Sequence, residues 1–220
     1  MDKISVVIIT LNEERNIGRC IESVTKVADE VLVIDSLSTD NTRKIAESYG
    51  ARLIEQPFLG HIEQKNFAKE KATHNWVLSL DADEALSEQL KLSILERKKN
   101  GLQGGYTMNR LTNYCGKWIK HSGWYPDVKL RLFRKEDGGW TGVNPHDRYE
   151  LTSKSKISHL QGDLLHFSFY TMDEHRSQIE KFSDISSQAK FNKGIRSNWL
   201  KVLVKPVAKF LKSYVIKRGF

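Results

Sequence analysis

Three carboxylates lie within four residues at Asp81, Asp83 and Glu84, directly after the apolar run 76–80. Because like charges this close repel one another, the cluster predicts a bound cation or a ligand rich in hydrogen-bond donors. Carboxylate oxygens are the ligands that Mg²⁺ and Mn²⁺ prefer. The segment LDADE therefore predicts a divalent-cation site at the end of a buried strand.

Three other apolar runs, residues 4–10, 30–35 and 52–55, also end in polar residues. In an open parallel sheet the ligand binds outside the carboxyl ends of the strands, so these positions are candidates for binding. Asn12 and Asp40 are explained equally well as helix N-caps. The polar side chains at these ends include Thr10, Asn12, Glu13, Asp35 and Asp40.

Helical patterns separate these strands in the first hundred residues. We expect one helix from an Asn12 cap to Val24, a second that ends at Gly50, and a third around residues 64–71. Strands that alternate with helices indicate an α/β fold with a mainly parallel, doubly wound sheet. Within this pattern Cys20 is expected in the core.

From Gly101 onward the chain changes to short aromatic-rich segments with Gly and Pro, which indicates loops and mixed strands. Thr171 and Glu174 have the spacing of a capping box, which predicts a helix that Gly194 ends. We assign residues 1–194 to one domain and residues 195–220 to a basic amphipathic tail.

The charge of the chain is unevenly distributed. Its 220 residues carry 35 Lys and Arg against 27 Asp and Glu, a net charge of +8. No acid follows Asp184, and the rest of the chain is close to neutral, which argues against a nucleic-acid groove over the whole surface. The nine late cations are Lys190, Lys193, Arg196, Lys201, Lys205, Lys209, Lys212, Lys217 and Arg218.

The sequence has two cysteines, Cys20 and Cys115, and contains no CxxC, Cys/His cluster or regular spacing that would indicate a zinc site or a disulfide framework. This favours a reducing compartment. The first apolar run is too short for a signal peptide, and no apolar stretch reaches the roughly 20 residues that span a bilayer. We therefore expect a cytoplasmic protein.

The ordered segments SVVIITLNEERNIGRCIESV, VIDSLSTDNT and LSLDADE resemble the GT-A fold glycosyltransferases of family 2. The segments YPDVKLRLF, PHD and LLHFS extend the resemblance more weakly over nearly the whole chain. It implies a Rossmann-like, mainly parallel sheet with flanking helices, a small mixed acceptor-side region and C-terminal helices. The family often has paired Asp residues after the second strand, but here Ser36 follows Asp35. The resemblance therefore does not identify the side chain that recognises the nucleotide base.

The resemblance also implies roles for the strand-end residues. Lys65 would lie near the donor's phosphates. Asp83 would bind the metal directly, and Asp81 would contact ribose or metal-bound water. The residues that would line a uridine pocket are Thr10, Asn12, Glu13 and Asp35.

Two further sites follow from the resemblance. His166 is a candidate metal ligand, although an isolated His in an apolar strand is more often a core residue or a cap. The segment containing His146 and Asp147 supplies an acid where the family has its base, so Asp147 is the candidate that deprotonates the acceptor. Asp127 is the rival base, and Asp147 could instead pair with Arg148.

Aromatic residues in Gly- and Pro-containing loops are candidates for acceptor binding, because flat rings stack on sugar faces. Trp124 and Tyr125 are the expected pair, although these rings could equally form the core of a small antiparallel sheet. An acidic acceptor could be bound by Lys117, Lys120 and Arg131.

The resulting hypothesis is an inverting, metal-dependent glycosyltransferase. It would move a sugar, glucose from UDP-glucose, to a heptose of the lipopolysaccharide core with Mg²⁺ or Mn²⁺ as cofactor. The alternatives are another lipid-linked or polysaccharide acceptor, a sugar nucleotidyltransferase, and a non-catalytic basic binding protein. The second lacks its usual Gly-rich phosphate loop, and the third leaves the acidic cluster unexplained.

The tail predicts where this reaction takes place. Apolar residues recur at helical spacing from Leu200 to Val215, with Lys201 and Lys205 among the cations around them. We expect reversible binding to the anionic inner face of the cytoplasmic membrane, without nucleic acid as a partner. Because proline disrupts helices, Pro206 predicts an element that is kinked or broken in two.

Overall fold

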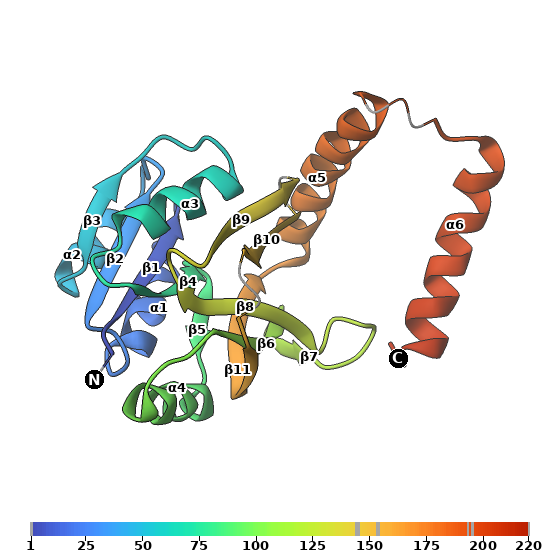
Figure 1. The fold of residues 1–220 in the computed structure, drawn as a ribbon. Coiled ribbons are helices and arrows are strands. Elements are labelled where there is room, and N and C mark those ends of the chain that lie inside the picture. The colour runs from blue at the N-terminus through green and yellow to red at the C-terminus, as the bar shows by residue number, and fades with distance from the viewer. Residues whose placement is uncertain (1, 144–145, 153–154, 193, 195, 220) are drawn as a thin grey trace. The chain divides into compact units, whose positions relative to one another are not determined.

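The computed structural model describes residues 2–143, 146–152, 155–192, 194 and 196–219 (Figure 1). The chain divides into two compact units. The first comprises Met1–Arg110 and Asp127–His166, and the second Leu111–Pro126 and Phe167–Phe220.

Four parallel strands form the centre of the first unit, in the order β3, β2, β1 and β4. Thr10 pairs with Asp35, and Ile9 with Asp81, so three of the strands end at one edge of the sheet. The predicted runs were right to within a residue. Strands β1, β2 and β4 are mostly buried and mostly apolar, as expected of strands covered on both faces, whereas the edge strand β3 is partly exposed and carries a charged residue at each end. The strands are β1 (Ile4–Thr10), β2 (Glu30–Asp35), β3 (Arg52–Glu55) and β4 (Trp76–Asp81).

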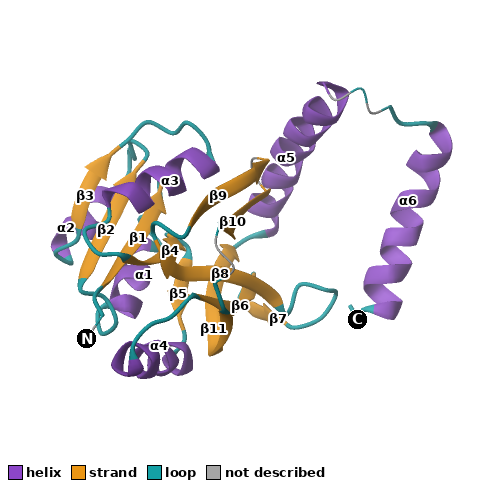
Figure 2. Ribbon diagram, viewed as in Figure 1, coloured by secondary structure: helices purple, strands orange, loops and turns teal. Residues whose placement is uncertain are grey.

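Helices cover both faces of this sheet (Figure 2). Val6 and Ile8 of β1 join one apolar cluster, with Ile21 of α1, whereas Val7 joins another, with Ala68 of α3. This division follows from the alternation of side chains along a strand. The helices are α1 (Ile17–Val24), α2 (Thr42–Ser48), α3 (His61–Lys71) and α4 (Glu88–Asn100).

The predicted start of the first helix was wrong. The helix begins at Ile17 after an Asn16 cap, and Asn12 has a left-handed φ of 54°. The side-chain Oδ1 of Asn12 accepts a hydrogen bond from the backbone N–H of Thr39 (2.8 Å). Asn12 therefore joins the β1 and β2 loops, which leaves its side chain unable to cap a helix.

Antiparallel strands continue the sheet beyond β4, as the mixed pattern after Gly101 predicted. The sheet runs β3, β2, β1, β4, β8, β6, β11 and β5, with β7 paired to β6, while β9 and β10 form a separate hairpin. The hairpin packs on the sheet through aromatic rings: Phe133 of β8 stacks on Tyr149 of β10, with ring centroids 3.5 Å apart. These strands are β5 (Glu84–Leu86), β6 (Gly105–Tyr114), β7 (Lys117–Ile119), β8 (Asp127–Arg134), β9 (Gly138–Val143), β10 (His146–Leu151) and β11 (Ile157–Phe169).

The second unit contains the C-terminal helices α5 (Met172–Asn192) and α6 (Trp199–Leu211). The predicted capping box is present, because the backbone N–H of Glu174 donates to Thr171 Oγ1 (3.2 Å) and that of Thr171 to Glu174 Oε2 (3.1 Å).

The break predicted at Pro206 was wrong. Helix α6 continues through Pro206 into a π-helical turn at Lys212–Ile216, and the carbonyl that loses its N–H partner belongs to exposed Val202, where water can hydrate it.

No described residue of α6 is buried. Within the described ranges, no helix is both long and apolar enough to cross a membrane.

Candidate functional site

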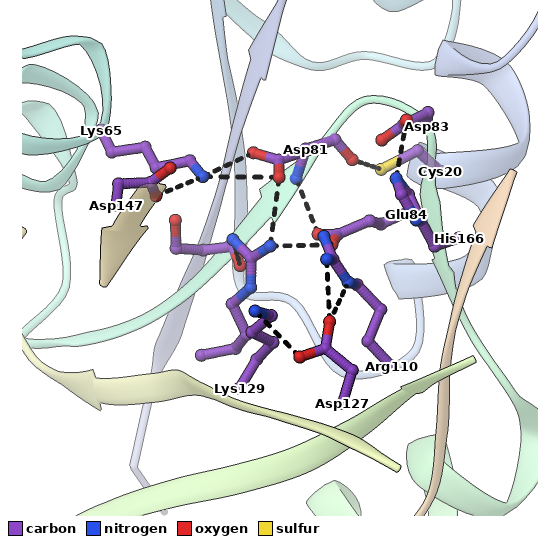
Figure 3. A network of polar contacts seen from close by, with 12 residues as sticks. Cys20, Lys65, Asp81, Asp83, Glu84, Arg110, Asp127, Lys129, Asp147 and His166 are labelled. Carbon is purple, nitrogen blue, oxygen red and sulfur yellow. Dashed lines mark hydrogen bonds and ion pairs between the residues drawn. The ribbon is translucent and has the colours of Figure 1, made fainter. Parts of the chain in front are cut away.

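Protein cations neutralise most of the acidic cluster (Figure 3). Arg131 Nη2 of β8 binds Asp81 Oδ2 (3.1 Å) and Glu84 Oε1 (2.7 Å). From α3, Lys65 Nζ lies 3.0 Å from Asp81 Oδ1. The repulsion inferred from the sequence is therefore relieved largely within the protein, and Asp81 and Glu84 do not in themselves require a metal.

The pKa values in this cluster reflect burial and charge pairing together. Burial alone would raise the pKa of Asp81, but Lys65 and Arg131 lower it well below its ordinary range. Burial raises the pKa of Glu84, and Arg131 opposes that rise only in part. The pKa of Arg131 is raised despite its burial, because Glu84 and Asp81 stabilise its charge. Arg131 thus remains a guanidinium that fixes both carboxyl groups.

Asp83 is separated from these cations and pairs with a histidine. Its Oδ2 lies 3.1 Å from His166 Nε2, and both side chains are partly exposed. Burial lowers the pKa of His166, but Asp83 outweighs burial and raises it above its ordinary value. Two neighbouring ligands of one octahedral ion, each bonded at about 2.1 Å, also lie about 3 Å apart. The oxygen and imidazole donors at this spacing fit a divalent cation.

A complete protein cage for a metal is absent from the described residues. They contain no group of three His, Cys, Asp or Glu side chains able to hold an ion. Mg²⁺ and Mn²⁺ commonly take only one or two protein ligands and fill the rest of their shell with water and substrate phosphates. Asp83 and His166 could hold such an ion in this way.

The β9–β10 hairpin brings Asp147 to the strand ends. Its Oδ2 accepts a hydrogen bond from Lys65 Nζ (2.8 Å), the same ammonium that contacts Asp81. The next residue on α3, Asn66, exchanges two hydrogen bonds with the backbone of Trp140 in β9 (2.9 and 3.0 Å). Helix α3 therefore holds the hairpin so that Asp147 faces the end of β4. The side chain of His146 lies outside the described residues.

The rival base Asp127 is more heavily paired. Its carboxylate binds Arg110 (2.8 Å) and Lys129 (3.0 Å). Burial raises its pKa, but Arg110 and Lys129 outweigh that effect and lower it. Two cations make Asp127 a poorer proton acceptor than a carboxylate with a single partner.

The side chains expected around a uridine lie in the first unit, at the ends of β1 and β2. Thr10 is 5% exposed and Asp35 is fully buried. The Thr10 hydroxyl and Asp35 Oδ1 have no hydrogen-bond partner among the described residues, whereas Asp35 Oδ2 accepts from the backbone N–H of Ser38 (2.7 Å). Buried polar atoms without partners are uncommon, so these two atoms are suited to bind a ligand.

Glu13, three residues after Thr10 in the chain, carries a perturbed carboxyl group. Burial raises its pKa to about 7, although a hydrogen bond from Asn16 Nδ2 (2.7 Å) to Glu13 Oε2 acts in the opposite direction. The charges of Asp83, Asp40 and Asp81 raise it further.

Gln64 is a buried polar residue next to the strand ends that no sequence motif had indicated. It is 1% exposed, and its Nε2 donates to Ser36 Oγ (3.0 Å) after β2 and to the Gln56 carbonyl (3.3 Å) after β3. With Lys65, Ala68 and Lys69 it forms the buried face of α3. The available signal was the 64, 65, 68, 69 spacing, which places a polar stripe on one side of a helix.

The predicted acceptor residues are located in different units. Trp124 and Tyr125 belong to the second unit, where the Trp124 ring contacts Tyr114 edge-on at 6.0 Å. Lys117 and Lys120 belong to it too and are exposed. Assigning Arg131 to an acidic acceptor was wrong, because it is 3% exposed and held by Asp81 and Glu84.

Comparison with known proteins identifies the family. The family model described as glycosyl transferase family 2 matches residues 5–168. This chain belongs to glycosyl transferase family 2. An uncharacterized glycosyltransferase of Rickettsia typhi is 32% identical to it, over 100% of this chain and 79% of that protein. The lipopolysaccharide core biosynthesis glycosyltransferase LpsC of Rhizobium meliloti is 30% identical, over 96% of this chain and 80% of LpsC.

Solved structures agree with the fold of a family 2 glycosyltransferase. Residues 1–349 of S. aureus TarS, in complex with UDP-GlcNAc, match with a TM-score of 0.53 at 20% identity. The match covers 76% of this chain and 58% of that chain, which is less than two thirds of it. The GT-A fold expected from the sequence is confirmed, and the chain is a glycosyltransferase.

Proposed function

We propose that this family 2 enzyme transfers glucose, with inversion, from UDP-glucose to a heptose of the lipopolysaccharide core. The observation that carries the proposal is one shared ammonium: Lys65 contacts both the strand-end Asp81 and Asp147. It joins the edge of the sheet where a donor binds in open α/β folds to a carboxylate able to act as a base. The similarity to LpsC over nearly the whole chain supports the acceptor class.

The nucleotide occupies the ends of β1 and β2 in this proposal. Thr10 and Asp35 supply the unpartnered buried oxygens, which accept N–H or O–H donors of the uridine. Asn12 and Glu13 belong to the loop that closes this end of the site, and Asn12 is fixed there by its hydrogen bonds with Ser38 and Thr39.

Asp83 and His166 hold the divalent cation, Mg²⁺ or Mn²⁺. When bound, such an ion supplies positive charge to the diphosphate of the leaving group. Asp81 stays ionised between Lys65 and Arg131. In this proposal it would contact ribose or metal-bound water.

Asp147 takes the proton of the acceptor hydroxyl as that oxygen attacks the anomeric carbon. A single displacement from the face opposite the diphosphate inverts the configuration at that carbon. Trp124 and Tyr125 bind the acceptor sugar by stacking.

The reaction takes place at the inner face of the cytoplasmic membrane in this proposal. Helix α6 exposes large apolar side chains and carries no acid. Each cation near an anionic bilayer contributes about 1 kcal/mol, and apolar side chains that enter the interface add to this. The exposed apolar residues of α6 and the π-helical turn are Trp199, Leu200, Val202, Leu203, Val204, Val207, Phe210, Leu211, Tyr214, Val215 and Ile216.

A nucleotide-binding experiment tests the donor assignment. Calorimetry with Mn²⁺ should show that UDP binds at least about tenfold more tightly than ADP, GDP or CDP. A donor screen with isolated lipopolysaccharide core should then give UDP release with UDP-glucose. Tighter binding of another nucleotide would overturn the uridine assignment. Formation of UTP from UDP-glucose and pyrophosphate would indicate a nucleotidyltransferase.

A further inference from the structure

The ammonium of Lys65 already has partners in every direction in which it can donate. It donates hydrogen bonds to Asp147 Oδ2 (2.8 Å) and Asp81 Oδ2 (3.4 Å), lies 3.0 Å from Asp81 Oδ1 as an ion pair, and lies 4.7 Å from the centre of the Trp140 ring. A lysine has three N–H donors, and the face of an aromatic ring attracts a cation. Lys65 is also only 3% exposed, so no donor is left over for a phosphate.

Asp81 and Asp147 differ in the number of cations with which they form ion pairs. Asp81 has a second cation, Arg131, at 3.1 Å. Among the described residues Asp147 forms an ion pair with Lys65 alone, through Oδ2. No described side chain hydrogen-bonds Oδ1 of Asp147, the oxygen that a base needs when it accepts a hydroxyl proton.

We propose that Lys65 is a positioning residue for Asp147 and not a ligand of the donor's phosphates. Its hydrogen bond to Oδ2 holds the carboxylate oriented toward the acceptor hydroxyl. This role rests on the proposed function, because it requires Asp147 to be the base.

Lys69 provides a matched control on the same helix. One turn beyond Lys65, its Nζ donates to the carbonyl of Gly138 in β9 (2.9 Å). Lys69 therefore holds the same hairpin by a buried ammonium without contacting Asp147. A loss of activity caused only by loosening of the hairpin should appear in both Lys65→Met and Lys69→Met.

The kinetic test separates positioning from phosphate binding. With UDP-glucose and the core acceptor, Lys65→Met should lower kcat about tenfold to hundredfold, since misplacing a reacting group costs rates of this order. Its Kd for UDP should change less than about threefold. Lys65→Arg, which keeps the charge, should recover part of the lost kcat. Lys69→Met should lower kcat at most about threefold, with all variants checked for folding by urea unfolding.

A double variant tests whether Lys65 acts through Asp147. In an Asp147→Asn background, Lys65→Met should cause little further loss of kcat, because the carboxylate it positions is already gone. Three results would each overturn the inference: a rise of more than about tenfold in the Kd for UDP with kcat unchanged, equal losses in Lys69→Met, or full additivity with Asp147→Asn. Wild-type protein that binds UDP but transfers no sugar would instead contradict the proposed function.

Discussion

Asp83 and His166 lie 3.1 Å apart, Oδ2 to Nε2, although 83 residues separate them in the chain. Asp83 follows β4, and His166 lies on β11, whose pairing with β5 sets His166 opposite Glu84. The pairing of two strands thus assembles the two candidate metal ligands.

Asp83→Asn should abolish the dependence of UDP binding on a divalent cation while the fold is kept. An amide is a much poorer ligand than a carboxylate for Mn²⁺, and loss of one negative charge reduces repulsion near Asp81. Calorimetric titration with UDP, with Mn²⁺ or with chelator, measures this. Asp173→Asn, an exposed change on α5, is the control for loss of an acid. Unchanged stimulation by Mn²⁺ in Asp83→Asn would remove Asp83 from the metal site.

Arg131→Met should lower the free energy of unfolding by about 3–5 kcal/mol, because it leaves the buried carboxyl of Glu84 without its closest cation. The exposed pair of Arg43 and Glu55 offers the matched control. Arg43→Met should cost less than about 1 kcal/mol. Urea denaturation of both variants gives the comparison, and equal losses would show that the buried pair has no special role in stability.

Glu13→Gln should change the pH dependence of stability. Since burial raises the pKa of Glu13 to about 7, the wild-type carboxyl is protonated in the folded state at pH values where the unfolded chain ionises. Its contribution to stability is present below about pH 4.5 and is lost as the pH rises to about 7. Between pH 5 and 8 the variant should therefore gain about 2–3 kcal/mol relative to wild type.

Urea denaturation in chelator at both pH values measures this gain. Glu14→Gln, at the exposed neighbouring carboxyl, is the control for removal of one charge. A stability difference between Glu13→Gln and wild type that does not vary with pH would contradict the raised pKa.

Deletion of residues after Asn198 should release the protein from anionic vesicles while turnover of a soluble acceptor survives. The deletion removes the exposed apolar side chains of α6 together with its lysines. Sedimentation with vesicles at low and high salt measures binding, which salt should weaken through the charge term.

A charge-matched control tests whether the position of the lysines matters. Changing three lysines of α6 to Gln should weaken binding far more than changing three exposed lysines of the first unit. Equal binding by full-length and shortened chains would exclude the tail as the membrane contact. The two sets are Lys201, Lys205 and Lys209 on α6, and Lys3, Lys26 and Lys44 on the first unit.

The sequence predicted local structure well and side-chain partners poorly. Mostly apolar runs identified β1, β2 and β4, because strands buried on both faces need apolar side chains in succession. The cations that neutralise Asp81 were not predictable in this way, since Lys65 and Arg131 lie 16 and 50 residues away in the chain. An acidic cluster alone therefore indicated a metal, whereas in the described structure Lys65 and Arg131 bind Asp81, Arg131 binds Glu84, and Asp83 pairs with His166. The burial of Arg131 was predictable, because the alternation of side chains along a strand puts it on the same face as buried Phe133.

Transfer of one hexose from UDP-glucose to heptose-terminated lipopolysaccharide core, followed by mass spectrometry of the acceptor, tests the proposed reaction most directly. Wild-type protein with Mn²⁺ should add a single hexose, and Asp147→Asn should do so about 10²–10⁴-fold more slowly with little change in UDP affinity. Activity retained in Asp147→Asn but lost in Asp127→Asn would exchange the two roles. No product from folded, UDP-binding wild-type protein would contradict the central claim.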